Sequence, residues 1–218
     1  MKLAIFDLDE TLIAGDSASL WLAFLVRRQL APADILEREH ELMAAYYRGQ
    51  MDMDAYMELT LAPIKNWQPR DLAPLVDEFV EQDILPLVYP AARQRLAWHT
   101  AQGHQRLIIS ATGEHLVKPI ARALGVDHAI GIQLECCDGV YNGRTHGVYS
   151  YQQGKLTRLQ DWLAMQPQTP AMTYGYSDSL NDLPLLEFVH RAAVVNGNEP
   201  LLQLAAERGW ERLNWHLS

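Results

Sequence analysis

Leu3-Ala4-Ile5-Phe6-Asp7-Leu8-Asp9-Glu10-Thr11-Leu12 opens the chain, and this stretch decides the fold. The apolar residues from Leu3 to Phe6 predict a short buried strand. Two carboxylates, Asp7 and Asp9, follow where the strand's periodicity ends and a loop begins. In a parallel sheet this edge is where ligands bind, so one acid can attack or hold a metal while the other carries a proton. An Asp pair in this place is also compatible with a turn or a helix cap, and the rest of the chain must decide.

The bulk composition is that of an ordinary globular chain. Its 218 residues are 49% hydrophobic and 21% charged, enough for one sizeable core or one domain with a large insertion. No apolar run approaches the roughly 20 residues of a membrane helix, and the opening run breaks at Asp7, so we expect neither a signal peptide nor a membrane partner. Cys136 and Cys137 are adjacent and lack zinc-site spacing, which favours a reducing, cytoplasmic compartment.

The charge is unevenly distributed along the chain. The net charge of −9 argues against a nucleic-acid partner. Residues 13–85 hold 13 acidic and 6 basic side chains, whereas the remainder holds 14 acidic and 12 basic ones. The acidity therefore belongs mainly to one segment.

From residue 86 onward, strand-like and helix-like stretches alternate. We expect strands at 105–109, 128–134, 171–176 and 192–195, and helices at 113–124, 155–164, 180–188 and 200–208. Turn signals at 138–139 and 142–143 predict a small hairpin. This alternation predicts parallel strands joined by right-handed helical crossovers. The segment 209–215 is compatible with either a last edge strand or a cover for the core.

The segment between the first strand and residue 86 shows helical patterns and no convincing strand. Helices are expected at 17–28, 32–48, 53–60 and 69–82, separated by breaks that contain Pro or Gly. A helical block inserted there predicts a lid over the site that the first strand helps to build. We therefore expect an α/β core of residues 1–12 and 86–218, with a Rossmann-like parallel sheet and helices on both faces, and an all-α cap of residues 13–85.

Three further polar groups stand in places comparable to the first. Ser110-Ala111-Thr112 ends a strand with hydroxyls just before a helix, whose N-terminus favours an anion. Lys155 begins another helix, and Asp178 and Asp182 follow a later strand. Each piece alone is compatible with a helix cap or a solvated side chain. In this order, however, they bring carboxylates, hydroxyls, amides and an ammonium to one crevice, which makes a turn at Asp7 a poor explanation.

The four segments resemble the motifs of the haloacid dehalogenase-like superfamily of phosphatases, in the branch that includes phosphoserine phosphatase. The resemblance covers nearly the whole chain, and the helical insert matches the position of that family's cap. It implies that Asp7 attacks phosphorus and forms an aspartyl-phosphate, while Asp9 protonates the leaving group and then deprotonates water. It also implies Mg²⁺, held by the carboxylates of Asp7 and Asp178 and the main-chain carbonyl of Asp9, with Asp182 in support.

The same resemblance implies how the phosphate is bound. Ser110 and the amides near Leu8 and Ala111 would bind the phosphoryl oxygens, Lys155 would neutralise charge, and Asn181 would position the phosphoryl group or a water. Dehalogenases need no acid to protonate a leaving halide. An acid at Asp9 therefore favours phosphate-ester chemistry.

The substrate must be inferred from the cap. Asp16 stands where phosphoserine phosphatases usually have Glu, and Ala62 falls where we would expect their substrate-binding arginine. A missing carboxylate partner and an acidic cap favour a small cationic phosphate monoester, with histidinol phosphate as the best fit. Asp16, Tyr56 and Glu58 are the principal candidates for its recognition. Further candidates to meet a cation or a ring are Trp21, Glu39, Tyr46, Tyr47 and Asp54.

Other functions remain open from the sequence. A phosphoserine phosphatase, a phosphotransferase of the same fold, a non-catalytic phosphate- or partner-binding module, and a metal-independent hydrolase using Ser110 are the alternatives. No Gly-x-Ser-x-Gly elbow surrounds Ser110, which disfavours the last. The histidines show no zinc spacing, and the oligomeric state cannot be read from the sequence.

Overall fold

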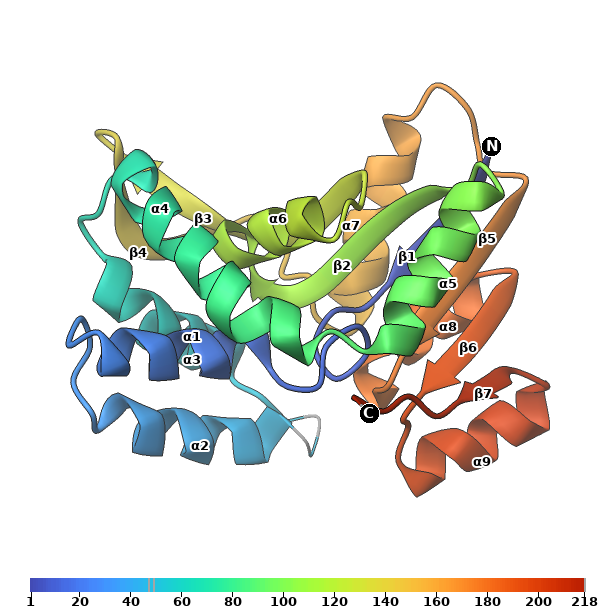
Figure 1. The fold of residues 1–218 in the computed structure, drawn as a ribbon, viewed down its shortest axis with the longest axis horizontal. Helices are drawn as coiled ribbons and strands as arrows, with labels where there is room; N and C mark the ends of the chain where they lie inside the picture. Colours follow the sequence, from blue (N-terminus) through green and yellow to red (C-terminus); the bar gives the residue numbers. More distant parts are fainter. Residues whose placement is uncertain (47, 49, 218) are drawn as a thin grey trace.

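The computed structural model describes residues 1–46, 48 and 50–217, and these form a three-layer α/β fold around one sheet (Figure 1). The strand order is β4-β3-β2-β1-β5-β6-β7. The strands are β1 (Lys2–Phe6), β2 (Gln105–Gly113), β3 (His128–Cys137), β4 (Val140–His146), β5 (Met172–Ser177), β6 (Arg191–Val195) and β7 (Glu211–Leu213). All neighbouring strands are parallel except β3 and β4, which form the predicted hairpin. The α/β class with a mostly parallel sheet is thus confirmed.

The first strand lies at the centre of the sheet. Ile5 of β1 pairs with Leu107 of β2 on one side and with Gly175 of β5 on the other. Every residue of β1 from Leu3 to Phe6 is fully buried, which is why this strand is a continuous apolar run. The carboxyl ends of β1, β2 and β5 consequently meet at one edge, and the loops that follow them are brought together.

Helices cover both faces of the sheet. Because side chains alternate along a strand, Ala4 and Phe6 pack on the face covered by α5 and α6, whereas Leu3 and Ile5 pack against α7, α8 and α9. These helices are α5 (Pro90–Ala101), α6 (Glu114–Ala123), α7 (Gln153–Ala164), α8 (Leu183–Phe188) and α9 (Glu199–Arg208). Two apolar layers therefore hold the central strands rigidly in place.

The segment after β1 is helical, as expected, and lies beside the edge where the loops of β1 and β2 emerge (Figure 1). Its helices are α1 (Ser17–Arg27), α2 (Ile35–Tyr46), α3 (Met53–Leu61) and α4 (Pro69–Phe79), followed by a π-helical turn at Val80–Ile84. Trp21 and Phe24 of α1 stack on each other and contact Phe79 of α4. We propose that residues 13–85 act as the cap of the site.

Some boundaries differ from those expected. Strand β2 continues through Ser110 to Gly113, with a shift of register against β3, so α6 begins only at Glu114. The expected helix at 69–82 leaves the α-helical form after Phe79. The C-terminal segment forms a last edge strand and also covers the core. Strand β7 extends the sheet, and Trp215 packs against Tyr89. No described helix is long and apolar enough to cross a membrane.

Candidate active site

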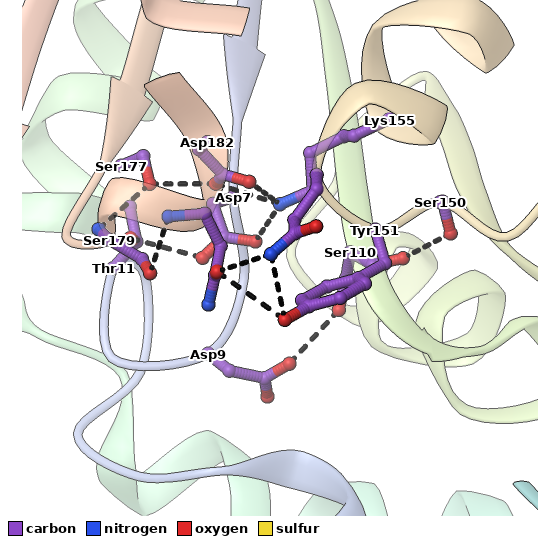
Figure 2. Close-up of polar contacts among 12 residues, drawn as sticks. Asp7, Asp9, Thr11, Ser110, Ser150, Tyr151, Lys155, Ser177, Ser179 and Asp182 are labelled. Atoms are coloured by element: carbon purple, nitrogen blue, oxygen red, sulfur yellow. Dashed lines mark hydrogen bonds and ion pairs between the residues drawn. The ribbon is translucent and has the colours of Figure 1, made fainter. Parts of the chain in front are cut away.

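Three charged groups meet beneath the carboxyl end of β1. Nζ of Lys155, in the first turn of α7, lies 2.8 Å from Oδ1 of Asp7 and 2.7 Å from Oδ1 of Asp182 (Figure 2). All three side chains are almost completely buried. Asp182 also accepts a hydrogen bond from the Ser177 hydroxyl at 2.7 Å. The lysine and the second acid are thus fixed against the predicted nucleophile.

Burial and neighbouring charges together set the pKa values of Lys155 and Asp7. Burial would lower the pKa of Lys155, but the carboxylates of Asp182 and Asp7 raise it, so the ammonium stays charged. Burial is the main cause that raises the pKa of Asp7 to about 7. The positive charge of Lys155 lowers this pKa, but the negative charges of Asp182 and Asp9 oppose that effect. The single positive charge of Lys155 therefore cannot neutralise both Asp7 and Asp182.

Thr11 connects Asp7 to the second acid cluster. Its hydroxyl oxygen lies 3.3 Å from Oδ2 of Asp7 and 3.0 Å from Oδ1 of Asp178, and it accepts the Asp178 backbone N–H at 3.0 Å. A hydroxyl carries a single proton, so it donates to one carboxylate at a time. Burial raises the pKa of Asp178 well above its usual range, and the Asp7 charge adds to this effect. The facing oxygens of Asp7 and Asp178 therefore share one donor.

This donor set suits a hard cation. Within residues 1–46, 48 and 50–217, no group of three or more Asp, Glu, His or Cys side chains is arranged to hold a metal by itself. Mg²⁺ is commonly held by only one or two carboxylates and keeps several waters. The carboxylates of Asp7 and Asp178, which share one hydroxyl proton, fit that requirement.

The Asp9 side chain occupies a separate network of donors. Its Oδ1 accepts the Ser17 backbone N–H at 2.6 Å, and its Oδ2 accepts the hydroxyls of Ser110 at 2.9 Å and Thr112 at 3.1 Å (the Ser110 contact is drawn in Figure 2). Burial, followed by the charge of Asp16, raises the pKa of Asp9 to about 6. A carboxyl with that pKa can both give and take a proton near neutral pH.

The loop after β1 turns both acids towards one small cavity. The Leu8 carbonyl accepts backbone N–H groups from Thr11, Leu12 and Ile13, which curls the chain tightly after the strand. Asp7, Asp9 and Ala111 line the same cavity. Ser110 is fully buried, and its own carbonyl accepts the Ser150 hydroxyl at 2.5 Å. The predicted phosphate-binding residues at the ends of β1 and β2 are therefore neighbours.

A larger cavity of about 330 Å³ adjoins this group. Its acidic lining comes from Asp9, Glu10, Asp16 and Asp178, and it also contains Met43, Arg48, Ser179, Leu180, Asn181, Asn196 and Asn198. Tyr56 of α3 lines the smaller cavity together with Asp7 and Asp9. The space beside the two acids is thus bounded on one side by residues of the helical insert.

Residues 4–187 match the family of haloacid dehalogenase-like hydrolases, which is most of the chain. The chain belongs to this family. The histidinol-phosphatase of Neisseria meningitidis is 39% identical over 219 residues, covering 98% of this chain and 99% of that protein. Phosphoserine phosphatase SerB1 of Mycobacterium tuberculosis is 30% identical over 214 residues, covering 95% of this chain and 69% of that protein. A Bordetella pertussis protein of unknown function has the same fold, with a TM-score of 0.90, 37% identity and coverage of 100% and 99%. The chain is a phosphatase of this haloacid dehalogenase-like superfamily.

Asp16 both caps helix α1 and lines the cavities beside Asp9. It is the N-cap of α1 and accepts the Ser19 backbone N–H at 2.8 Å, and it also lines both cavities beside Asp9. The Ser19 hydroxyl in turn donates to Glu39 of α2. Burial raises the pKa of Asp16. Capping and a place in the cavity are therefore compatible in one side chain.

Glu58 does not line either of the two cavities that contain Asp9 and Asp16. It lines a separate cavity between α3 and the β3–β4 hairpin, together with Asp54 and Ala62. Residues two apart on a helix point about 200° from each other, which agrees with Tyr56 and Glu58 lining different cavities. Trp21 is packed against Phe24 in the core. Tyr47 lies outside the described residues, and the Tyr46 side chain is not described.

Several residues of this site were not assigned a role from sequence. Thr11, Thr112 and Ser177 place hydroxyls on the acids, and Gln152 donates to Asn181 Oδ1 at 3.1 Å. The sequence could have indicated Thr11 and Thr112, because both lie inside the quoted motifs. Arg48, Asn196 and Asn198 carried no recognisable signal, since they reach the cavity from segments distant in sequence.

Proposed function

We propose that this phosphatase hydrolyses small phosphate monoesters by transferring the phosphoryl group to Asp7. One observation carries the proposal: Asp7 and Asp9 line one cavity, while Asp7 contacts a buried lysine and Asp9 contacts three proton donors. A fixed carboxylate beside a second, proton-carrying carboxyl is the pair that two-step phosphoester hydrolysis requires.

In the first step a carboxylate oxygen of Asp7 attacks phosphorus, and the bond between phosphorus and the ester oxygen breaks. Asp9, in its protonated form, gives its proton to the departing oxygen. In the second step Asp9 takes a proton from a water, whose oxygen attacks phosphorus and releases inorganic phosphate. Asp7 is then regenerated as a carboxylate. Lys155 and the Ser110 hydroxyl stabilise the charge on the phosphoryl oxygens throughout.

We propose Mg²⁺ as the cofactor, held by the carboxylates of Asp7 and Asp178 and the main-chain carbonyl of Asp9. When bound, Mg²⁺ neutralises the repulsion between a carboxylate and a phosphate dianion. Asp182 was expected to support the metal. Since both of its oxygens contact Lys155 and one also accepts from Ser177, we propose that it acts by fixing the lysine.

Histidinol phosphate is the substrate that we propose. The cavity beside Asp9 contains four carboxylates and one guanidinium, so it favours a cationic leaving group. The similarity to the Neisseria histidinol-phosphatase over nearly the full length of both chains supports the same substrate. Two free, exposed cysteines favour a cytoplasmic location, which we also propose.

Phosphoserine is the second candidate, because of one specific observation. Arg48 lines the same cavity as Asp16, so a guanidinium for a substrate carboxylate is present after all. Ala62, where sequence reasoning placed that arginine, lies in the other cavity. An ammonium at Asp16 and a carboxylate at Arg48 would accommodate phosphoserine.

Comparing kcat/KM on histidinol phosphate and phosphoserine tests the assignment. The proposal predicts a preference of at least tenfold for histidinol phosphate, since one charged hydrogen bond contributes about 1.5–3 kcal/mol. Asp9→Asn serves as the inactive control. A preference for phosphoserine would reverse the assignment, and formation of a new phosphate ester with an added alcohol would identify a phosphotransferase.

A further inference from the structure

Another cavity, of about 460 Å³, is lined by residues of α5, β5, β6 and β7 and of the turn after α9, and it does not include any residue assigned above to catalysis. We propose that this cavity binds a small molecule that combines a planar aromatic ring with an anionic group. The inference goes beyond the proposed phosphatase activity and does not depend on it.

The cavity exists because helices leave part of the sheet uncovered. On the face packed by α5, Tyr174 pairs with Arg191, and Tyr176 lies in register with Ala193, which pairs with Glu211. Helix α9 packs on the opposite face. Beyond α5, the floor of β5, β6 and β7 is therefore open, and the cavity is lined by α5, by these three strands and by the turn after α9.

Aromatic side chains form the walls of the cavity. Trp98 of α5 is 45% exposed, although large aromatic side chains are usually covered. Its ring stands nearly perpendicular to that of Tyr174, at 6.3 Å and 83°, and it also packs edge-on against His99. Trp210 lines the cavity from the turn after α9. Trp98, held by its neighbours, and Tyr174 offer a slot in which a planar ring can stack. Trp210 borders this slot, while it also packs against the apolar cluster of the opposite face.

Arginines surround the same slot in a chain whose net charge is −9. Arg95, Arg191 and Arg208 line the cavity. Glu211 binds Arg95 through both guanidinium NH2 groups, at 3.2 and 2.9 Å, and Glu187 pairs with Arg208 at 2.9 Å.

Of the three arginines that line this cavity, Arg191 has no acidic partner among the described residues. Across residues 1–46, 48 and 50–217, its side chain makes neither an ion pair nor a hydrogen bond. An exposed, unpaired guanidinium next to aromatic rings is suited to bind a carboxylate, sulfonate or phosphate attached to a stacked ring.

The floor of this cavity touches the strands that carry the catalytic acids. Tyr176 stacks on Phe6 with ring centroids 4.5 Å apart, and Phe6 immediately precedes Asp7. The Tyr176 hydroxyl lies 3.2 Å from Arg95 and 2.9 Å from Nε2 of His99. A bound ligand would therefore contact a ring that packs on the residue next to Asp7.

Indole N–H signals in ¹⁵N NMR spectra test the proposal without measuring turnover. The chain has six tryptophans, so each can be followed separately after assignment with Trp98→Phe and Trp210→Phe. Naphthalene-2-sulfonate is the probe, because it has a ring and an anion but no phosphate ester. We expect saturable shifts of the Trp98 and Trp210 signals and no shift of Trp21.

Arg191→Gln should weaken the binding of this probe about tenfold, as expected for loss of one charge-assisted contact. Arg212→Gln is the matched control, because Arg212 pairs with Val194 and so lies on the opposite face of the edge strands. We expect 2-naphthol and methanesulfonate, each with half of the recognised chemistry, to bind at least tenfold more weakly. Unchanged thermal unfolding would show that both variants are folded.

Several results would overturn the proposal. They are the absence of saturable shifts at Trp98 and Trp210, equal binding to wild type and Arg191→Gln, or methanesulfonate binding as tightly as naphthalene-2-sulfonate. Shifts produced by an acidic peptide, or by raising the protein concentration, but not by the probe would assign the surface to a macromolecular partner instead.

Discussion

Nζ of Lys155 lies 2.8 Å from Oδ1 of Asp7, and both side chains are almost completely buried. The same ammonium lies 2.7 Å from Asp182, so it contacts two acids at once. If Asp7 is the nucleophile, as proposed, this arrangement ties stability to catalysis, because the group that restrains Asp7 also pairs with a second buried carboxylate.

Replacing Lys155 by Met should therefore damage both properties. We expect the free energy of unfolding to fall by about 3–5 kcal/mol, because Asp7 and Asp182 lose their buried cation. We expect kcat to fall by about 10²–10³-fold, as when one stabilising donor is removed from a transition state. Urea unfolding and initial rates measure the two effects. Lys118→Met is the control, since Lys118 pairs with Glu114 at the surface. Equal effects of the two substitutions would contradict this role.

Mg²⁺ should stabilise the folded protein through Asp178. At about 100 times the dissociation constant, a ligand that binds only the folded state adds about 2.7 kcal/mol. We expect Asp178→Asn to lose this gain while keeping its stability in EDTA, because a neutral amide relieves the crowding of Asp7, Asp178 and Asp182. Thermal unfolding with and without Mg²⁺ measures both. A full Mg²⁺ effect in Asp178→Asn would show that the ion binds elsewhere.

The raised pKa of Asp7 makes stability depend on pH when Mg²⁺ is absent. Since burial raises this pKa from 3.8 to about 7, the folded state holds a proton that the unfolded state has already lost. The contribution is present below about pH 4 and is lost as pH rises towards 7, by up to about 1.4 kcal/mol per pH unit. The free energy of unfolding of the wild type and of Asp7→Asn is measured with urea in EDTA at several pH values. The difference between the two proteins should show this slope. Saturating Mg²⁺ should flatten it, and a slope of opposite sign would refute the cause.

Asp16→Asn separates capping from substrate binding. Asn is as good an N-cap as Asp, so α1 should stay intact. If Asp16 meets the substrate cation, kcat/KM for histidinol phosphate should fall about tenfold, while that for p-nitrophenyl phosphate, which has no cation, should change little. Asp54→Asn is the matched control, because Asp54 lines the other cavity. Equal losses on both substrates would restrict Asp16 to a structural role.

The core of the site was predictable because it depends on strand ends. A buried apolar run followed by Asp7, hydroxyls after a second run, and acids after a third are local patterns, and parallel pairing of β1 with β2 and β5 is enough to bring them together. Helix α5 was not foreseen. Its buried residues are Ala92, Leu96 and His99, which do not form a strong apolar stripe.

The lining of the cavity beside Asp9 was less predictable for a physical reason. Arg48 follows α2, whereas Asn196 and Asn198 follow β6, and only the tertiary packing of the insert brings them to one cavity. Helical phase alone would have predicted that Tyr56 and Glu58 of α3 line different cavities.

Trapping the intermediate tests the central claim most directly. The protein is mixed with ³²P-labelled histidinol phosphate and Mg²⁺, quenched in acid during turnover, reduced with borohydride and digested, so that a phosphorylated aspartate is recovered as homoserine at its position. The account predicts homoserine at residue 7 and no trapped label in Asp7→Asn. Label at Asp9 or Ser110, or turnover in Asp7→Asn at the wild-type rate, would contradict it.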